Sequence, residues 1–153
     1  MVFKISKQIR VVVSEDIEGD IEESVEFLNS VENEFVPWGY STVKKINDCD
    51  YAMVYQKGNP DKTLNAILKV QDVVPRESPK LSRSNFPPEW DESYDYFKSF
   101  YLVDEILDCR DSPISMSDVR NLKEEEITQR GKLRSGIFVK YIGNSERVLN
   151  FIN

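Results

Sequence analysis

The chain has 153 residues, a length that suits one domain built around a single hydrophobic core. Hydrophobic residues make up 40% and charged residues 31%, and no stretch approaches the roughly 18 apolar residues of a membrane span. The net charge of −7 argues against a protein that coats nucleic acid with its whole surface, and the absence of histidine removes the usual general base and most zinc sites. We therefore expect neither an enzyme nor a bound metal or cofactor.

The cysteines and the N-terminus indicate the compartment. Cys49 and Cys109 are the only two cysteines, and their wide separation favours packed thiols in a reducing cytoplasm over a disulfide framework. The first ten residues interleave Lys4, Lys7 and Arg10 with apolar residues, without the continuous apolar region of a secretory signal. The sequence predicts one cytoplasmic domain over residues 1–153.

Charge is unevenly distributed along the chain. Residues 1–34 carry nine acids and three bases, and residues 89–153 carry thirteen acids and nine bases. Residues 35–88 carry five acids and eight bases, so only the middle of the chain is basic. An electrostatic footprint for nucleic acid is expected there. The candidate contacts to a phosphate backbone are Lys44, Lys45, Arg76, Lys80 and Arg83.

The first third of the chain predicts a strand, a helix and a loop. A β-branched run predicts a buried strand over Gln8–Ser14. An approximate capping box and apolar residues at helical spacing predict an amphipathic helix over Asp20–Ser30, whose early acids suit the helix dipole. In Phe35–Ser41, proline and glycine bracket Trp38 and predict an irregular loop.

The middle of the chain predicts a hairpin followed by a long loop. Asp50–Gln56 and Thr63–Val74 are apolar runs joined by a Gly, Asn and Pro segment, which predicts two antiparallel strands. Pro75–Asp95 is rich in Pro, Ser and charge and predicts a long loop that contains Trp90. Long loops inside a compact domain are commonly functional.

The last third predicts a strand, a helix, a strand and a terminal helix. The predicted elements are Phe97–Ile106, Ser117–Glu126, Ile137–Tyr141 and Arg147–Ile152. The strands are too clustered for an alternating βαβ sheet. We expect an α+β fold with a curved, barrel-like mixed sheet and flanking helices.

Two tryptophans lie where local sequence gives them no regular structure. One interpretation is that Trp38 and Trp90 plug the end of the sheet as part of the core. The other is that the two indoles face each other and sandwich a flat or cationic group, because aromatic walls bind a base by stacking. Under the second interpretation, replacing either indole by alanine abolishes ligand preference and leaves the fold intact.

The order of these segments resembles a known family. The resemblance covers roughly residues 8–142 and is carried by Val13-Ser14-Glu15-Asp16-Ile17, Trp38-Gly39-Tyr40-Ser41-Thr42, Asp50–Tyr55, Ile67–Val74, a second Trp in a proline-flanked loop, and Phe97–Ile106 leading into Ile114-Ser115-Met116. In these features the chain is similar to the YTH domains and related EVE domains of the PUA-like superfamily. A similar domain also forms the DNA-reading module of some McrB-type modification-dependent restriction systems.

This resemblance implies a reader of methylated bases. The cage would be formed by Trp38 and Trp90, with Tyr40, Tyr94 or Tyr96 as a third wall. Ser14 and Asp16 would face the base edge, and Ser41 belongs to the same Trp-bearing segment. The favoured ligand is N6-methyladenine flipped out of DNA, and 5-methylcytosine is the other base that the sequence leaves open. The implied partners are the AAA+ motor and nuclease subunits of a restriction system. No Walker-type phosphate loop occurs in the chain, so we expect any motor to be a separate subunit or segment.

Three alternatives remain open from the sequence. The first is a YTH-like reader of methylated RNA. The second is an acidic protein-interaction module that binds no nucleic acid. The third is an enzyme, for which Asp104, Glu105 and Asp108 are the best candidates, although carboxylates on a strand and turn are more often a solvated face.

Overall fold

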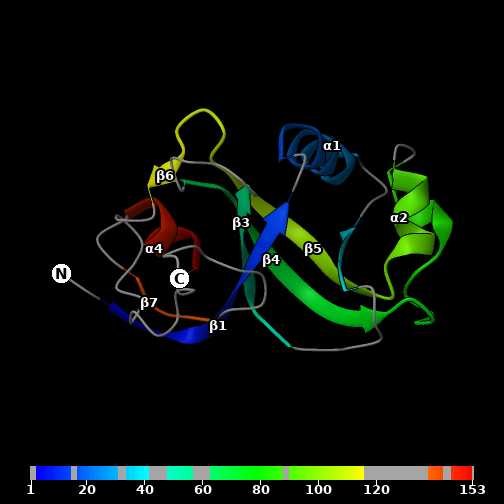
Figure 1. Cartoon of the computed structure of the whole chain (residues 1–153), viewed down its shortest axis with the longest axis horizontal. Coiled ribbons are helices and arrows are strands. Elements are labelled where there is room, and N and C mark those ends of the chain that lie inside the picture. The colour runs from blue at the N-terminus through cyan, green and yellow to red at the C-terminus, as the bar shows by residue number, and fades with distance from the viewer. Residues whose placement is uncertain are drawn as a thin grey trace.

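A computed structural model shows an open, strongly curved mixed sheet with helices on both of its faces (Figure 1). The structure describes residues 3–14, 17–30, 34–41, 48–56, 63–87, 90–115, 138–142 and 146–152. The elements are β1 (Phe3–Ser14), α1 (Ile17–Asn29), β2 (Val36–Ser41), β3 (Tyr51–Gln56), β4 (Thr63–Pro75), the 3-10 helix η1 (Arg83–Asn85), α2 (Asp91–Tyr96), β5 (Ser99–Asp108), β6 (Ile114–Ser115), β7 (Phe138–Ile142) and α4 (Glu146–Ile152).

The sheet runs in the order β2-β5-β4-β3-β1-β7, with β6 paired to β4 outside this path. β3 and β4 pair antiparallel, which confirms the predicted hairpin, whereas β1 and β3 pair parallel. Among the described residues no pairing joins β2 to β7, so the sheet is open where the sequence predicted a barrel-like closure. The mixed α+β class is confirmed.

Two predicted loops contain regular structure. The segment around Trp38 is the edge strand β2, which pairs antiparallel with β5. An edge strand tolerates Pro37, because a proline nitrogen can face away from the ladder without losing a hydrogen bond. The predicted loop Pro75–Asp95 contains η1 and the start of α2. The predicted helix Ser117–Glu126 lies outside the described residues.

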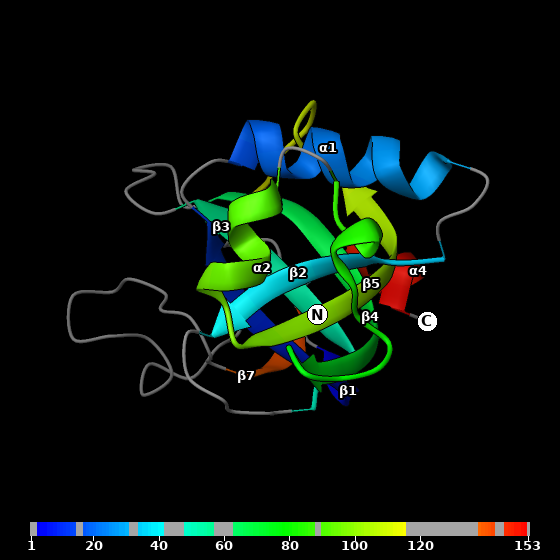
Figure 2. The same ribbon diagram turned by 90° about the vertical axis from the view of Figure 1, so that its right-hand side faces the viewer.

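The helix α1 confirms the predicted amphipathic pattern and begins three residues earlier, at Ile17. Ile21 is fully buried, and Val25 and Leu28 contact the same core cluster. Glu22 and Glu26 are exposed. Figure 2 shows this helix lying along one side of the sheet with α2 beside β2. The thirteen-residue α1 is the longest helix in the described ranges, and no helix there has the length and apolarity needed to cross a membrane.

The buried side chains form two clusters on opposite faces of the sheet. Along β3, Ala52 and Val54 belong to one cluster and Tyr51 and Met53 to the other, which follows from the alternation of side chains along a strand. The first cluster, called here the aromatic cluster, holds Trp38, Trp90, Phe86, Phe100 and Tyr101 among its buried members. The second lies beneath α4.

The C-terminal helix is tied to the sheet by a tyrosine. Val148 and Ile152 of α4 are buried in the second cluster. The Tyr51 hydroxyl donates to the carbonyl of Ile152 at 3.4 Å and approaches that of Phe151 at 3.5 Å. The Tyr51 ring meets the Phe151 ring edge to face at 5.7 Å. The Tyr51 hydroxyl therefore supplies a donor to the carbonyls that the end of the helix leaves without an intrahelical partner.

We expect the attachment of α4 to weaken in alkali. Burial raises the pKa of Tyr51 above its ordinary value; the charge of Lys69 opposes this rise, and neighbouring carboxylates add to it. A phenol whose pKa is raised by folding stabilises the fold while it is protonated, and this contribution is lost as the pH rises through the folded-state pKa. Thermal unfolding followed between about pH 8 and pH 11 should show a steeper alkaline decline for wild type than for Tyr51→Phe. Identical pH profiles would contradict the role assigned to this hydroxyl.

Candidate aromatic site

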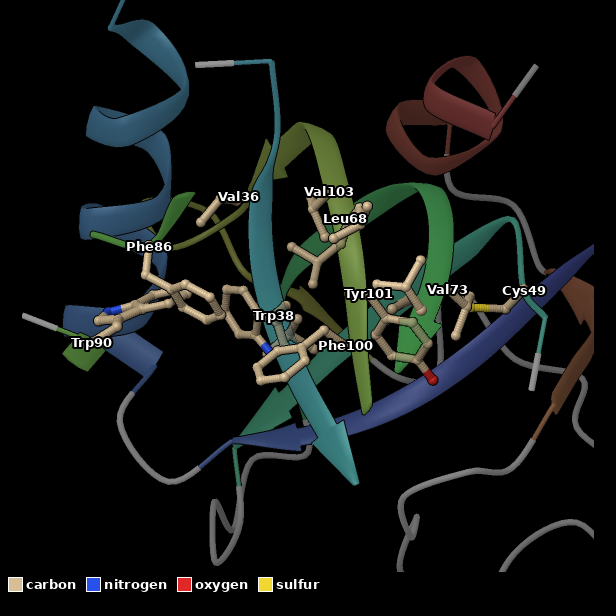
Figure 3. Packing of buried hydrophobic residues seen from close by; sticks show 14 of the residues in the cluster. Val36, Trp38, Cys49, Leu68, Val73, Phe86, Trp90, Phe100, Tyr101 and Val103 are labelled. Carbon is tan, nitrogen blue, oxygen red and sulfur yellow. The ribbon is translucent and has the colours of Figure 1, made fainter. Parts of the chain in front are cut away.

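Trp38 is held in the middle of β2. It pairs with Tyr101 of β5, and its side chain is 5% exposed. The indole lies among the side chains of the aromatic cluster, as Figure 3 shows. Because its backbone belongs to the ladder between β2 and β5, the position of this ring is set by the sheet.

Trp90 lies on the connection between β4 and β5, immediately before α2. Its backbone N–H donates to the carbonyl of Pro87 at 2.9 Å. Its indole N–H donates to the carboxylate of Glu23 on α1 in a short hydrogen bond. The side chain is 9% exposed and belongs to the aromatic cluster. This one residue thus joins α1 to the β4–β5 connection.

The two indoles contact each other edge to face. Their ring centroids are 5.6 Å apart and their planes make an angle of 89° (Figure 3). Two parallel walls that enclose a base have to stand about 7 Å apart, since each stacked contact takes about 3.5 Å. The structure therefore brings the tryptophans together, but the expectation of an open slot between facing rings is not met. The burial of both indoles agrees with the first interpretation of the sequence, in which Trp38 and Trp90 are part of the core.

Further aromatic rings surround this pair. Phe86 meets Tyr94 and Phe100 edge to face at 5.5 and 5.3 Å, and Phe97 meets Phe100 at 6.2 Å. Of the predicted third-wall residues, Tyr94 is partly buried beside Phe86, whereas Tyr96 is 65% exposed. Edge-to-face contacts of this kind add about 0.5–1.5 kcal/mol each beyond area burial. The aromatic cluster therefore consists of rings that pack edge to face on one side of the sheet.

Gly39 is required by the close approach of one of these rings. A Cβ placed on Gly39 would overlap the ring of Phe97, with Cε2 at 2.7 Å and two further ring atoms nearer still. The Phe97 ring therefore occupies the space that a side chain at position 39 would need. Glycine beside Trp38 serves packing here, rather than the irregular loop that the sequence predicted.

Three of the five basic residues predicted to contact phosphate lie in the described β4–β5 connection. Arg76 donates to the carbonyls of Tyr94 and Asp95, near the end of α2. Arg83 forms an ion pair with Asp95 at 2.7 Å, and its guanidinium lies 4.7 Å from the centroid of the Tyr94 ring. Arg76 and Arg83 thus contact the C-terminal end of α2, the helix that directly follows Trp90.

Lys80 is paired as well. Its ammonium group lies 2.5 Å from a carboxylate oxygen of Asp72. The hydrogen bond from Lys80 is the main reason that the pKa of Asp72 lies below its ordinary value, and the backbone N–H of Val73 contributes. A phosphate that binds these side chains therefore competes with intramolecular partners.

Of the other predicted site residues, Ser14 lies on a different strand from the pair, and Tyr40 and Ser41 lie on the strand of Trp38. Ser14 ends β1 and pairs with Gln56, and three strands separate β1 from β2 in the sheet order. Tyr40 and Ser41 follow Gly39 in β2, where Ser41 pairs with Ser99. Asp16, Lys44 and Lys45 lie outside the described residues.

The carboxylates considered for catalysis are spread along β5. Glu105 lies 3.7 Å from the ammonium group of Lys69. Asp108 is bonded to Arg110, which is the main reason that its pKa is lowered. One carboxylate oxygen of Asp104 is buried without a hydrogen-bond partner among the described residues. Two of the three are thus engaged in ion pairs on the strand.

Sequence reasoning missed Glu23 as a residue of this site. The sequence predicts it as the partner of Asp20 in an approximate capping box and, with Glu22 and Glu26, as an acid that suits the helix dipole, and neither role points to Trp90. Only the fold brings its carboxylate to the indole of Trp90.

No family model, curated protein or solved structure matches this chain. The resemblance to the PUA-like superfamily therefore stays a prediction from the sequence.

Proposed function

We propose that this domain is a nucleic-acid reader that captures a flipped methylated base, N6-methyladenine first, at the Trp38–Trp90 pair. The observation that carries the proposal is the direct contact of two indoles from distant parts of the chain. Trp38 sits in a strand, whereas Trp90 sits in a connection and is outside the strand ladders. In the proposal, Trp38 is a fixed wall, and Trp90 withdraws to admit the base and then closes over it.

The free energy lost when Trp90 withdraws, compared with the free energy gained when a base stacks, determines how tightly the site binds. Withdrawal of Trp90 loses an edge-to-face contact, about 0.5–1.5 kcal/mol, and a hydrogen bond to a carboxylate, about 1.5–3 kcal/mol. Stacking of a base returns about 1–3 kcal/mol per base, and a buried methyl adds about 0.8 kcal/mol. Because these quantities nearly cancel, a free nucleoside should bind weakly, and contacts to the nucleic-acid backbone have to supply the affinity.

The basic residues of the β4–β5 connection are the proposed source of that affinity. Arg76, Lys80 and Arg83 precede Trp90 on the same connection, and the side chains of Lys80 and Arg83 are 58% and 52% exposed. On binding, these side chains would leave their intramolecular partners and contact phosphates instead. The affinity would therefore fall strongly as the salt concentration rises. Flipping the base out of a duplex costs a few kcal/mol more, and motor and nuclease subunits of a restriction system would act on the captured site.

Titration with matched oligonucleotides tests the proposal. Both tryptophans of the chain belong to the pair, so their fluorescence reports this site alone. We expect DNA with one N6-methyladenine to bind at least about fourfold more tightly than unmethylated DNA, which is the factor that burial of one methyl gives. Trp38→Phe should reduce this preference, because the smaller ring stacks less. Tyr51→Phe, in the opposite cluster, is the matched control and should retain it.

The same titration separates the other functions. Absence of binding to every DNA and RNA oligonucleotide at low salt, where charge contacts are strongest, would overturn the proposal and favour a protein-interaction module. A preference for methylated RNA over methylated DNA would identify an RNA reader. Binding that ignores methylation, in wild type and Trp38→Phe alike, would remove the tryptophan pair from the function.

A further inference from the structure

The carboxylate of Glu23 is a hydrogen-bond acceptor placed at the tryptophan pair. Glu23 is partly buried, whereas Glu22 and Glu26 on the same helix are exposed. Its Oε2 accepts the indole N–H of Trp90, the partner that the described part of the chain gives it. The neighbouring Ile21 and Ser24 are fully buried and Glu22 is exposed, so Glu23 lies at the border between the buried and the exposed face of α1.

Withdrawal of Trp90 would leave this acceptor without its donor. Because Glu23 is only partly buried, water would replace the lost donor incompletely, and this loss costs more for a charged group than for a neutral one. The edge-to-face geometry leaves no space for a base while Trp90 stays in place. A ligand that displaces the indole therefore binds best when it brings an N–H donor to the position that the indole N–H has left.

We infer that Glu23 is a specificity-determining residue, whose carboxylate accepts an exocyclic N–H of the captured base when Trp90 withdraws. This inference rests on the proposed function and names the group of the ligand that the site reads. N6-methyladenine keeps one N6–H for this bond. N6,N6-dimethyladenine has none, although its ring stacks equally well and its second methyl adds apolar area.

Stacking and hydrogen bonding therefore predict opposite orders for these two bases. If only stacking and apolar burial act, the dimethylated base binds more tightly, by about fourfold for one extra methyl. If Glu23 accepts the N6–H, the monomethylated base binds more tightly, by about threefold to fortyfold, which is the factor for a hydrogen bond to a charged acceptor after the opposing gain from the extra methyl is subtracted. The sign of the preference decides between the two.

The experiment titrates the full chain with single-stranded DNA that carries one adenine, N6-methyladenine or N6,N6-dimethyladenine. Single strands avoid a difference in base pairing between the three bases. The ratio of the mono- to the dimethyl affinity is compared in wild type, Glu23→Gln, Glu23→Met and Glu26→Gln. Glu23→Gln keeps a neutral acceptor for the Trp90 N–H and so preserves the fold. Glu26→Gln removes the same charge from an exposed position of the helix.

We expect wild type and Glu26→Gln to share a strong monomethyl preference, Glu23→Gln to show a reduced one, and Glu23→Met to lose or reverse it. A purely structural role of Glu23 would weaken all ligands equally and leave the ratio unchanged, and that result overturns the inference. Methyl-selective binding with the same ratio in wild type and Glu23→Gln overturns the inference while the reader function stands. Binding of none of the three strands by wild type overturns both. Should Glu23→Met unfold, Glu23→Gln alone decides.

Discussion

Replacement of Trp38 by alanine should lower the free energy of unfolding by about 3–5 kcal/mol, the range for removing a large aromatic side chain from a core. The indole is 5% exposed, lies in a ladder strand and contacts Trp90. Since a domain is typically stable by only about 5–15 kcal/mol, this variant should be partly unfolded at modest denaturant concentrations. Denaturant titration followed by far-ultraviolet circular dichroism measures the loss without relying on tryptophan fluorescence.

The matched variant is Trp38→Phe, which keeps a buried ring and should lose clearly less stability than the alanine variant. This expectation differs from the one drawn from the sequence, under which a cage residue can be removed with the fold intact. An alanine variant as stable as wild type would mean that the indole contributes little to the fold, and that the site stands open in solution. Binding experiments therefore use phenylalanine at this position.

Replacement of Gly39 by alanine should cost about 1–3 kcal/mol, the range for forcing an extra carbon into a filled core. The added Cβ would overlap the ring of Phe97, and that ring is itself in contact with Phe100. The backbone of Gly39 lies outside the left-handed region, so the cost comes from lack of space rather than from the conformation. The midpoint of denaturant unfolding measures it.

A double-mutant cycle with Phe97→Ala isolates this clash. In the Phe97→Ala background the space beside position 39 is open, and alanine is favoured over glycine in a strand by about 0.5–1 kcal/mol. Gly39→Ala should therefore be neutral or stabilising there, so the two substitutions are strongly non-additive. An equal loss in both backgrounds would show that Phe97 is not the obstacle.

The parts of the fold that the sequence predicted well are those with a local signal. The hairpin of β3 and β4 followed from two apolar runs around a turn, and α1 followed from the spacing of Ile21, Val25 and Leu28. The terminal helix α4 was predicted within one residue of its start. In each case neighbouring residues carry the information, as expected for periodic segments.

The parts that failed depend on contacts between distant segments. Pro37 and Gly39 predicted a loop, but pairing with β5 overrode the local preference and made β2 an edge strand. The acidic residues before Tyr96 gave no helical pattern of apolar residues, so the sequence did not predict α2. Tyr94 of this helix packs against the aromatic cluster.

The candidate site shows the same division. Composition and loop position drew attention to Trp38 and Trp90, and the fold does bring them together. Their perpendicular geometry and the bond to Glu23 depend on how α1 packs against the β4–β5 connection, which no local pattern encodes. The same holds for Arg83, whose partner Asp95 on α2 lies 12 residues further along the chain, beyond the reach of a local pattern.

The pairing of β1 with β7 has a consequence for any attempt to shorten this chain. The first and last strands are neighbours, and α4 covers the cluster that contains Ile9 of β1. A fragment that stops before Phe138 would leave β1 as a long unprotected edge and uncover apolar side chains such as Met53. Exposed edges of this kind recruit other strands, so such a truncation should aggregate, whereas the tryptophan pair on the other face would keep its neighbours.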